Sequence, residues 1–311
     1  MNRLLAILVA IALLVRPAIG DQARPATTDA ELRYWIANMG AHNYSLAEMA
    51  DVLGVDTNRI YAERAKPAFQ PIQGTPGKVF VLPYPGGRHP RIGFLDGAVD
   101  PQRETKFSAF TPWDSNSYVV VDVPEAIFSN LGLTYLAHTH VPTIWTEKKV
   151  TLPPLEWKRN ADGSLESERV LPNQIAFGVK VRPAFSNAVL MELWLRNGTD
   201  KPLTGMRVQN CVMLKAVNGF NQQTNVNKIL TKPFAVCGSS DQKRWIITAW
   251  EPCHRTWANP PVPCMHSDPQ IPDCPPGETK TVRGWLSFYE GTNVTNELKR
   301  IEALPWRDAA R

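Results

Sequence analysis

The sequence lacks the short motifs that mark the commonest enzyme chemistries. It contains no Gly-x-Ser-x-Gly nucleophile turn, no phosphate-binding glycine loop, no dinucleotide-binding glycine fingerprint and no His-Glu-x-x-His metal motif. It also has no internal repeat, and its only biased stretch is the proline-rich segment 260–276. These absences disfavour nucleotide chemistry and the common hydrolase nucleophiles.

Charge and long apolar runs are also scarce. Only 20% of the residues are charged, and the net charge of +5 is spread along the chain without a dense basic block. Such a balance gives no electrostatic reason to expect a nucleic-acid partner. The apolar run Leu4–Val15 is shorter than the roughly 20 residues that span a bilayer. We therefore expect no membrane span after removal of the signal segment described next.

The first twenty residues have the organisation of a secretory signal. A cationic start at Arg3 precedes the apolar run Leu4–Val15, and small residues follow at Ala18 and Gly20. Cleavage after residue 20 would remove two arginines and lower the net charge from +5 to +3. We expect a periplasmic or secreted protein, with a retained N-terminal anchor as the alternative.

The chain has five cysteines, and in an oxidising compartment four of them could form disulfides. Cys211 lies inside a strand-like run over 206–214, so it is predicted to be the buried free thiol. The alternative is a zinc site, although the spacings of its candidate ligands match no standard pattern. Those candidates are Cys253, His254, Cys264, His266 and Cys274.

Residues 21–66 are expected to be a helical segment. Ser45 followed by Glu48 forms a capping box, Gly54 is suited to end that helix, and Asp56 is suited to begin the next. The spacing resembles a helix-turn-helix, which alone would suggest DNA binding. Behind a secretory signal, we interpret it as a helical hairpin that packs on the main domain.

Residues 67–311 are expected to form the main domain. Short strand-like runs alternate with Gly, Pro, Asn and Asp, and no helices lie between them. The fold class is therefore mainly β, a large antiparallel β-sandwich with a short C-terminal helix that reaches Ile301. The predicted strands are Lys78–Leu82, Arg91–Leu95, Lys106–Phe110, Tyr118–Val123, Leu133–His140, Trp145–Leu152, Leu155–Arg159, Ser167–Val170, Gln174–Val181, Ala188–Leu195, Gly205–Leu214, Arg244–Trp250 and Thr279–Tyr289.

Two histidines end one of these predicted strands. His138 and His140 are two residues apart, so their side chains share one face of the strand. Together with Gly132 they resemble the first half of the metal-binding motif of cupins, although Glu147 stands two places later than the glutamate of that motif. The resemblance implies a divalent transition metal held by His138 and His140. The alternatives are a pair that contacts substrate or transfers protons, and a purely structural pair.

A second group of chemically capable residues follows the strand that ends at Trp250. It is predicted to form a proline-rich loop held in place by disulfides, where binding and catalytic groups often gather. Flat tryptophans beside carboxylates, arginine and histidine suit a sugar, whose hydroxyls need polar partners. The alternative is an exposed disulfide loop with solvated charges. The residues are Trp250, Glu251, His254, Arg255, His266 and Asp268.

The stretch before the histidine strand offers a further contact. Trp113 and Asp114 follow a proline and are expected in a turn, where they could touch a ligand. Arg103, Glu104 and Lys106 surround a strand start and are interpreted as a surface ion-pair set.

Two segments are similar to parts of the galactose-mutarotase-like sandwiches. Glu192–Thr204 has the apolar strand and the Asn-x-Thr-Asp-x-Pro-Leu turn of that family, and Cys274–Glu278 leads into a strand containing Trp285. The resemblance implies a sandwich whose concave face holds a sugar between histidines and a carboxylate. The chain as a whole also resembles exported bacterial proteins of unassigned function that share the strings Arg91–Gly97 and His266–Pro269.

These observations predict an exported protein that binds or acts on a carbohydrate or another polar small molecule, without a cofactor. An enzyme would be an epimerase, lyase or hydrolase of the acid–base type. The alternatives are a cupin-like metal-dependent enzyme and a non-catalytic envelope or glycan-binding protein. The candidate catalytic residues are His138, His140, Glu251, His266 and Asp268, and the candidate substrate contacts are Trp113, Asp114, Trp250, His254, Arg255 and Trp285.

Overall fold

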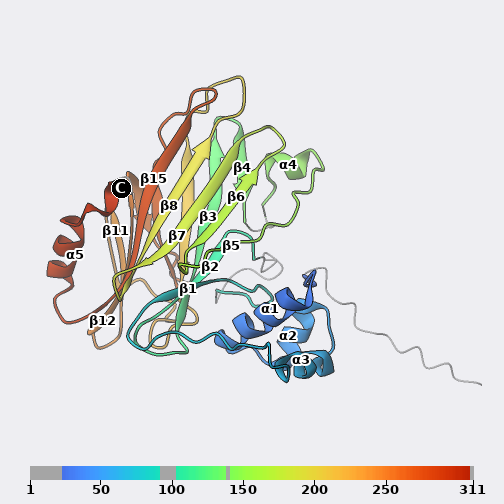
Figure 1. The fold of residues 1–311 in the computed structure, drawn as a ribbon. Coiled ribbons are helices and arrows are strands. Elements are labelled where there is room, and N and C mark those ends of the chain that lie inside the picture. The colour runs from blue at the N-terminus through green and yellow to red at the C-terminus, as the bar shows by residue number, and fades with distance from the viewer. Residues whose placement is uncertain (1–22, 92–102, 138–140, 309–311) are drawn as a thin grey trace, which may run out of the picture.

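The computed structural model describes residues 23–91, 103–137 and 141–308. Two antiparallel sheets pack face to face and form a mainly β protein (Figure 1). A group of helices from the N-terminal part lies at one end, and a helix near the C-terminus lies on the outer side of one sheet. The predicted fold class is confirmed. Within the described residues, no helix is long and apolar enough to cross a membrane.

The first sheet has seven strands in the order β1-β2-β3-β9-β14-β13, and β4 pairs with β3 beside this path. All of its pairings are antiparallel. The strands are β1 (Phe80–Pro83), β2 (Lys106–Phe110), β3 (Tyr118–Ser129), β4 (Gly132–Leu136), β9 (Arg207–Met213), β13 (Cys253–Trp257) and β14 (Cys264–Pro269).

The second sheet has eight strands in the order β10-β11-β12-β15-β8-β7-β6-β5. Along β8, buried residues alternate with partly buried ones from Val189 to Leu195, as expected when one face is turned to the core. The strands are β5 (Lys158–Arg159), β6 (Leu165–Val170), β7 (Ala176–Ala184), β8 (Ala188–Arg196), β10 (Lys228–Thr231), β11 (Phe234–Gly238), β12 (Arg244–Glu251) and β15 (Thr279–Glu290).

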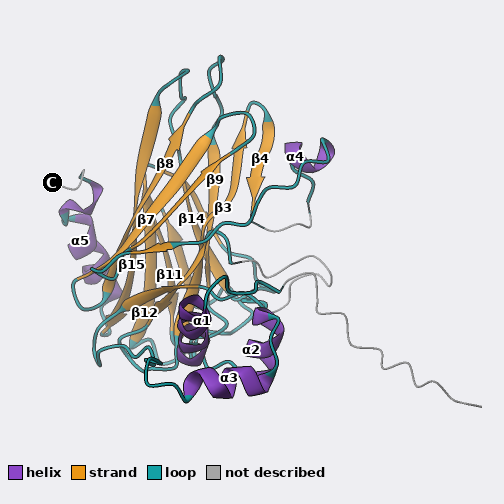
Figure 2. Ribbon diagram, turned by 45° about the vertical axis from the view of Figure 1, so that its right-hand side comes forward, coloured by secondary structure: helices purple, strands orange, loops and turns teal. Residues whose placement is uncertain are grey.

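The main core lies between the two sheets. Val119 and Val121 of β3 face Leu193 and Leu195 of β8 within one continuous apolar cluster. A second cluster on the outer face of the eight-stranded sheet is covered by α5 (Val294–Glu302) and the short helix η1 (Pro305–Arg307), as Figure 2 shows for α5. Part of the outer face of the seven-stranded sheet is likewise covered by an apolar cluster that includes Val120 and Met213.

The N-terminal helices are α1 (Asp29–Ala41), α2 (Leu46–Leu53) and α3 (Thr57–Arg64). The predicted capping box is present: Ser45 accepts from the backbone of Glu48, whose side chain accepts from the backbone of Ser45. Gly54 adopts the left-handed conformation at the end of α2, with φ of 63°, and Asp56 caps α3. The predicted helical hairpin thus exists, with a further helix before it.

His42 joins these helices to the seven-stranded sheet. Its Nδ1 bonds to the carbonyl of Asn38 at 2.8 Å, and its Nε2 bonds to the hydroxyl of Ser108 in β2 at 2.7 Å. The ring is 1% exposed and lies edge-on to Phe110 and Tyr118. Burial lowers the pKa of His42 to about 3, so the ring stays neutral.

This burial predicts a specific acid sensitivity. The unfolded chain binds a proton at His42 below about pH 6.5 and the folded protein does not, so stability falls as pH drops from about 6.5 towards 3. Between about pH 7 and pH 5 we expect His42 to contribute a loss of about 2 kcal/mol of unfolding free energy, seen as the difference in pH dependence between wild type and His42→Gln. Urea melts of the wild type and of His42→Gln measure it. An equal pH dependence in both proteins would contradict the prediction.

Some sequence-based expectations are wrong. Trp145–Leu152 is not a strand, because Thr143 caps the short helix α4 (Ile144–Glu147) through bonds to the backbone of residues 145 and 146. The predicted cysteine-rich loop is largely a β-hairpin of β13 and β14. None of the five cysteines is bonded to another, so the structure does not contain the predicted disulfides. Lys106 is fully buried, so the predicted surface ion-pair set is an interior one.

Candidate functional site

The outer face of the seven-stranded sheet carries a row of polar side chains. Alternation along β9 brings Arg207, Gln209 and Cys211 to this face, and alternation along β14 brings Cys264, His266 and Asp268 beside them. Two adjoining cavities of about 140 and 230 Å³ lie over this row, and both are lined by Phe128 and Gln209. We call them together the outer groove. It is lined by Arg91, Glu125, Phe128, Leu133, Leu136, Val141, Arg207, Gln209, His254, Arg255, Trp257, Cys264, His266 and Asp268, with further apolar contacts.

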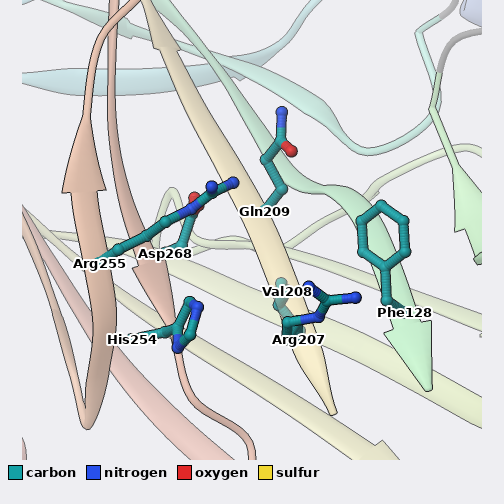
Figure 3. A pocket seen from close by; sticks show the side chains of 7 residues that line it. All are labelled: Phe128, Arg207, Val208, Gln209, His254, Arg255 and Asp268. Carbon is teal, nitrogen blue, oxygen red and sulfur yellow. The ribbon is translucent and has the colours of Figure 1, made fainter. Parts of the chain in front are cut away.

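Asp268 is held as a hydrogen-bond acceptor in one half of the groove. Its Oδ2 accepts from Nε of Arg255 at 2.8 Å and from Nε1 of Trp257 at 2.7 Å, and its Oδ1 accepts from the backbone of Asn210 at 3.2 Å. Figure 3 shows the guanidinium of Arg255 turned towards this carboxylate. Arg207 lies opposite, between His254 and Phe128. Asp268 therefore fixes the positions of the Arg255 and Trp257 side chains on this side of the groove.

His266 lines the larger cavity of the groove. Its ring stacks on Trp257 with 3.8 Å between the ring centroids and 11° between the planes. Its Nε2 lies 3.5 Å from Sγ of Cys264, and its Nδ1 lies 3.8 Å from Oε2 of Glu125. Burial alone would lower the pKa of His266, but the Cys211 sulfur and the carboxylates of Glu125 and Asp268 outweigh it and raise the pKa to about 9.

Glu125 and Arg91 form a buried ion pair beside His266. Arg91 donates to Oε1 of Glu125, and the amide of Gln209 donates to Oε2 at 2.8 Å. The two charged residues are 6% and 3% exposed, so their charges interact with little solvent screening. Buried charged groups at the edge of a cavity are a recognised mark of a functional site.

Two thiols lie next to His266. Cys264 and Cys211 are 3% and 0% exposed, and both are free. Burial raises the pKa of Cys211 well above its usual value. A hydrogen bond from Cys211 lowers the pKa of Cys264, against the effect of burial and with the help of Arg91. Cys264 is thus the thiol of the pair that ionises more easily.

The structure brings together four of the residues predicted from the sequence. His254, Arg255, His266 and Asp268 all line the outer groove. His138 and His140 lie outside the described residues, so their predicted role and metal site stay predictions. Leu136, two residues before His138, and Val141, directly after His140, line the groove.

Three other predicted residues do not reach the groove. Trp250 is 1% exposed in the core between the sheets, over Gly284 of the neighbouring strand. Trp285 is fully buried beneath η1, and its Nε1 donates to Ser287 at 2.8 Å. Glu251 ends β12 and lies 3.9 Å from Arg307. The two tryptophans are closed off from solvent because they face packed apolar layers, so neither can contact a ligand in this conformation.

Trp113 and Asp114, predicted to contact a ligand from a turn before β3, instead make contacts within the protein. Trp113 stacks on Phe220 with 5.5 Å between the centroids and meets Phe288 edge-on. Asp114 accepts from the backbone of Asn116 and from the hydroxyl of Ser117, both at 2.9 Å. These contacts stabilise a turn outside the outer groove.

The sequence analysis missed Glu125, Cys211, Gln209, Arg207 and Trp257 as parts of this site, and it named Cys264 only as a candidate zinc ligand. One signal was present: Cys264, His266 and Asp268 are spaced by two, which is the period of a strand. The proline-rich surroundings hid that period. No spacing along the chain could connect Cys211 to Cys264, because the pairing of β9 with β14 brings them together.

Two larger cavities lie on the other sheet. One of about 530 Å³ lies beside the amide-rich segment over 222–229. Another of about 1090 Å³ is an open basin beside η1, where Arg283 lies 2.6 Å from Glu192. Neither combines buried charged groups with thiols and an imidazole. The outer groove is therefore the better candidate for a functional site.

Comparison with known proteins identifies no family and gives only weak structural similarities. No protein-family model and no curated protein matches the chain. Among solved structures, it is similar to a candidate aldose 1-epimerase from Escherichia coli K12, with 10% identity, a TM-score of 0.33, and 44% of this chain and 69% of that chain covered. A protein from Synechocystis sp. PCC 6803 matches with 8% identity, a TM-score of 0.36, and 60% and 88% covered. A mutant heparan sulfate lyase from Pedobacter heparinus matches with 8% identity, a TM-score of 0.34, and 87% and 43% covered.

Proposed function

We propose that the outer groove binds a carbohydrate, with preference for an acidic saccharide. The observation that supports this most directly is the convergence of charged, amide and aromatic side chains around one groove on a rigid sheet. The two cavities together reach the lower end of the range of roughly 300–1,000 Å³ that is usual for small-molecule sites. They suit one or two sugar rings of a longer chain.

Aromatic side chains supply the apolar part of the site. Trp257 is half-buried, and its ring is fixed by stacking on His266 and by the bond from its Nε1 to Asp268. The ring of Phe128 lines both cavities. Sugar rings present C–H groups on their faces, so rigid aromatic rings bind them at little entropic cost.

The charges of the groove favour an acidic ligand. Its two carboxylates already have cationic partners, Arg255 for Asp268 and Arg91 for Glu125. Arg207 is exposed and forms no ion pair with any of the described residues, and its guanidinium lies 5.4 Å from the centre of the Phe128 ring. A guanidinium binds carboxylate and sulfate groups through paired hydrogen bonds. Arg207 is thus the group that would bind the acid function of the sugar.

We further propose that the protein works outside the cytoplasm, because residues 1–20 have the pattern of a secretory signal. An acid–base reaction on the bound sugar, of the epimerase, lyase or hydrolase type, remains part of the proposal. Of the predicted catalytic residues, His266 and Asp268 line the groove. A protein that binds without turnover is the second candidate, because Asp268 is already occupied by three donors.

Titration calorimetry with matched acidic and neutral oligosaccharides tests the proposal. We expect binding of at least one uronic-acid or sulfated oligosaccharide, and a loss of affinity of about 10–100-fold in Arg207→Gln, since a hydrogen bond to a charged group contributes about 1.5–3 kcal/mol. Arg196→Gln, which removes an exposed arginine from the other sheet, is the matched control.

The control variant should bind like the wild type. Equal losses in both variants would show that only the net charge matters and would count against the groove. Binding of neutral sugars alone would overturn the acidic preference, and no binding across the panel would overturn the proposal.

A further inference from the structure

Three potential metal ligands converge at the inner end of the outer groove. The sulfur atoms of Cys211 and Cys264 and a ring nitrogen of His266 all lie within 4.8 Å of one another. Cys264 and His266 are two apart on β14, so their side chains share one face. Cys211 comes from β9, which pairs with β14 so that Met265 lies opposite Val212. Two paired strands in the centre of a sheet therefore hold the donors.

The spacing of these atoms fits one tetrahedral ion. Zinc–sulfur bonds of about 2.3 Å and zinc–nitrogen bonds of about 2.0–2.1 Å place sulfur and nitrogen ligands about 3.5 Å apart. The distance from Sγ of Cys264 to Nε2 of His266 is 3.5 Å. Small side-chain rotations would bring the Cys211 sulfur within bonding distance of the same ion, because it lies at most 4.8 Å from the other two donors.

We propose that Cys211, Cys264 and His266 bind a zinc ion. Two thiolates and an imidazole are the soft and borderline donors that zinc prefers. Three protein ligands leave a fourth position, and Cys264 and His266 both line the larger cavity of the outer groove. The fourth ligand would therefore be a water or a group of a molecule bound in the groove, as at catalytic zinc sites.

The surroundings of His266 support this role. Its Nδ1 is buried and has no hydrogen-bond partner among the described residues, and it lies 3.8 Å from Oε2 of Glu125. A metal-binding histidine usually directs its second nitrogen at such a carboxylate, which fixes the ring and increases its basicity. Glu125 is itself held by Arg91 and Gln209. Stacking on Trp257 restrains the ring further.

The balance of charge also favours an ion at this position. Two buried thiolates without a cation would be costly, because burial penalises charge. With zinc, the two thiolate charges are neutralised, and Glu125 is already paired with Arg91. The site would therefore be neutral as a whole, in a place where Cys211 and Cys264 are at most 3% exposed.

This ligand set differs from the zinc site considered from the sequence. Cys253, His254 and Cys274 do not take part: Cys253 contacts Ser267 at 3.7 Å, and Cys274 donates to the carbonyl of Glu278 at 3.2 Å. In the proposed site His266 binds the metal, whereas the sequence analysis predicted that it transfers protons.

Direct metal binding tests the proposal, whatever the carbohydrate results show. The full-length mature protein is reduced, stripped with a chelator and dialysed against Zn²⁺, and its metal content is measured by mass spectrometry. We expect about one equivalent of zinc. Cys211→Ser and Cys264→Ser should each lower the zinc affinity at least about 100-fold, because each removes a thiolate ligand. Cys237→Ser, which removes an equally buried thiol from the other sheet, should keep wild-type affinity.

Cobalt provides a readout that needs no variant. Co²⁺ bound to the wild type by two thiolates should show intense sulfur-to-metal charge-transfer absorption, which decides the matter if the serine variants do not fold. Less than about a tenth of an equivalent of zinc in the reduced wild type, weak cobalt absorption, or equal losses in Cys237→Ser would overturn the proposal. So would a Cys211–Cys264 disulfide in protein isolated from its own compartment, because it would remove both ligands.

Discussion

Replacing Lys106 by methionine is expected to lower the free energy of unfolding by about 3–5 kcal/mol. Lys106 in β2 and Asp122 in β3 lie opposite each other, and both side chains are 0% exposed. The ammonium lies 3.2 Å from the Asp122 carboxylate, which also accepts from Thr105 at 2.8 Å. Removing the cation leaves the carboxylate charge buried with less compensation, and that penalty is the source of the loss.

Chemical denaturation of two further variants isolates the cause. Lys280→Met also breaks a lysine–carboxylate pair, with 2.6 Å to Glu278, but these side chains are 28% and 50% exposed. It should cost at most about 1 kcal/mol. The double variant Lys106→Met/Asp122→Leu should recover a large part of the loss, because it removes both charges. A cost below about 1 kcal/mol for Lys106→Met would show that this pair is not buried as described.

Replacing Trp250 by alanine is expected to destabilise the protein by about 3–5 kcal/mol. Its side chain is 1% exposed, and a Cβ on Gly284 would approach the Trp250 ring to 2.6 Å, so the ring is packed directly against the neighbouring strand. Its removal leaves a cavity that the sheets cannot close. The affinity of the folded fraction for a groove ligand should stay unchanged, because the ring does not line the groove.

Trp257→Ala is the matched comparison, because it makes the same substitution at a tryptophan that lines the groove. Trp257 is half-buried and lines the groove. Its loss should cost less stability than the loss of Trp250 and should lower oligosaccharide affinity about tenfold, because it removes an aromatic contact and releases Asp268. Thermal melts and calorimetry on both variants give the comparison. A large loss of affinity in Trp250→Ala with none in Trp257→Ala would reverse the assignment of the two rings.

Much of the fold could be predicted because local signals and the global fold agree. The capping box at Ser45 and the left-handed position at Gly54 formed as predicted, since each depends on a few neighbouring residues. The strands around Val119 and Leu193 also formed, because their apolar residues are buried between two sheets.

The errors concern residues whose burial depends on how strands and sheets pack against one another. Lys106 was assigned to the surface because lysine is rarely buried, but its partner Asp122 comes from the next strand of the sheet. Trp250 was assigned to a ligand site because the sequence does not show which face of β12 is covered. The β13–β14 hairpin was interpreted as a loop because of its many prolines.

The candidate site was predicted in part. His254, Arg255, His266 and Asp268 are close in sequence and fall on one hairpin, so they stayed together in the structure. Glu125 and Cys211 come from strands more than fifty residues away from Cys264, and only the sheet order β3-β9-β14 places them beside it. Sequence patterns describe faces of single strands, and they do not give that order.

The most direct test of a carbohydrate site in the outer groove is a crystal structure of the protein with the tightest-binding oligosaccharide. The account predicts a sugar ring between Phe128 and Trp257, with an acid group within hydrogen-bond distance of the Arg207 guanidinium. A sugar bound instead in the basin beside η1 or near the segment over 222–229, with the groove closed to it, would contradict the account.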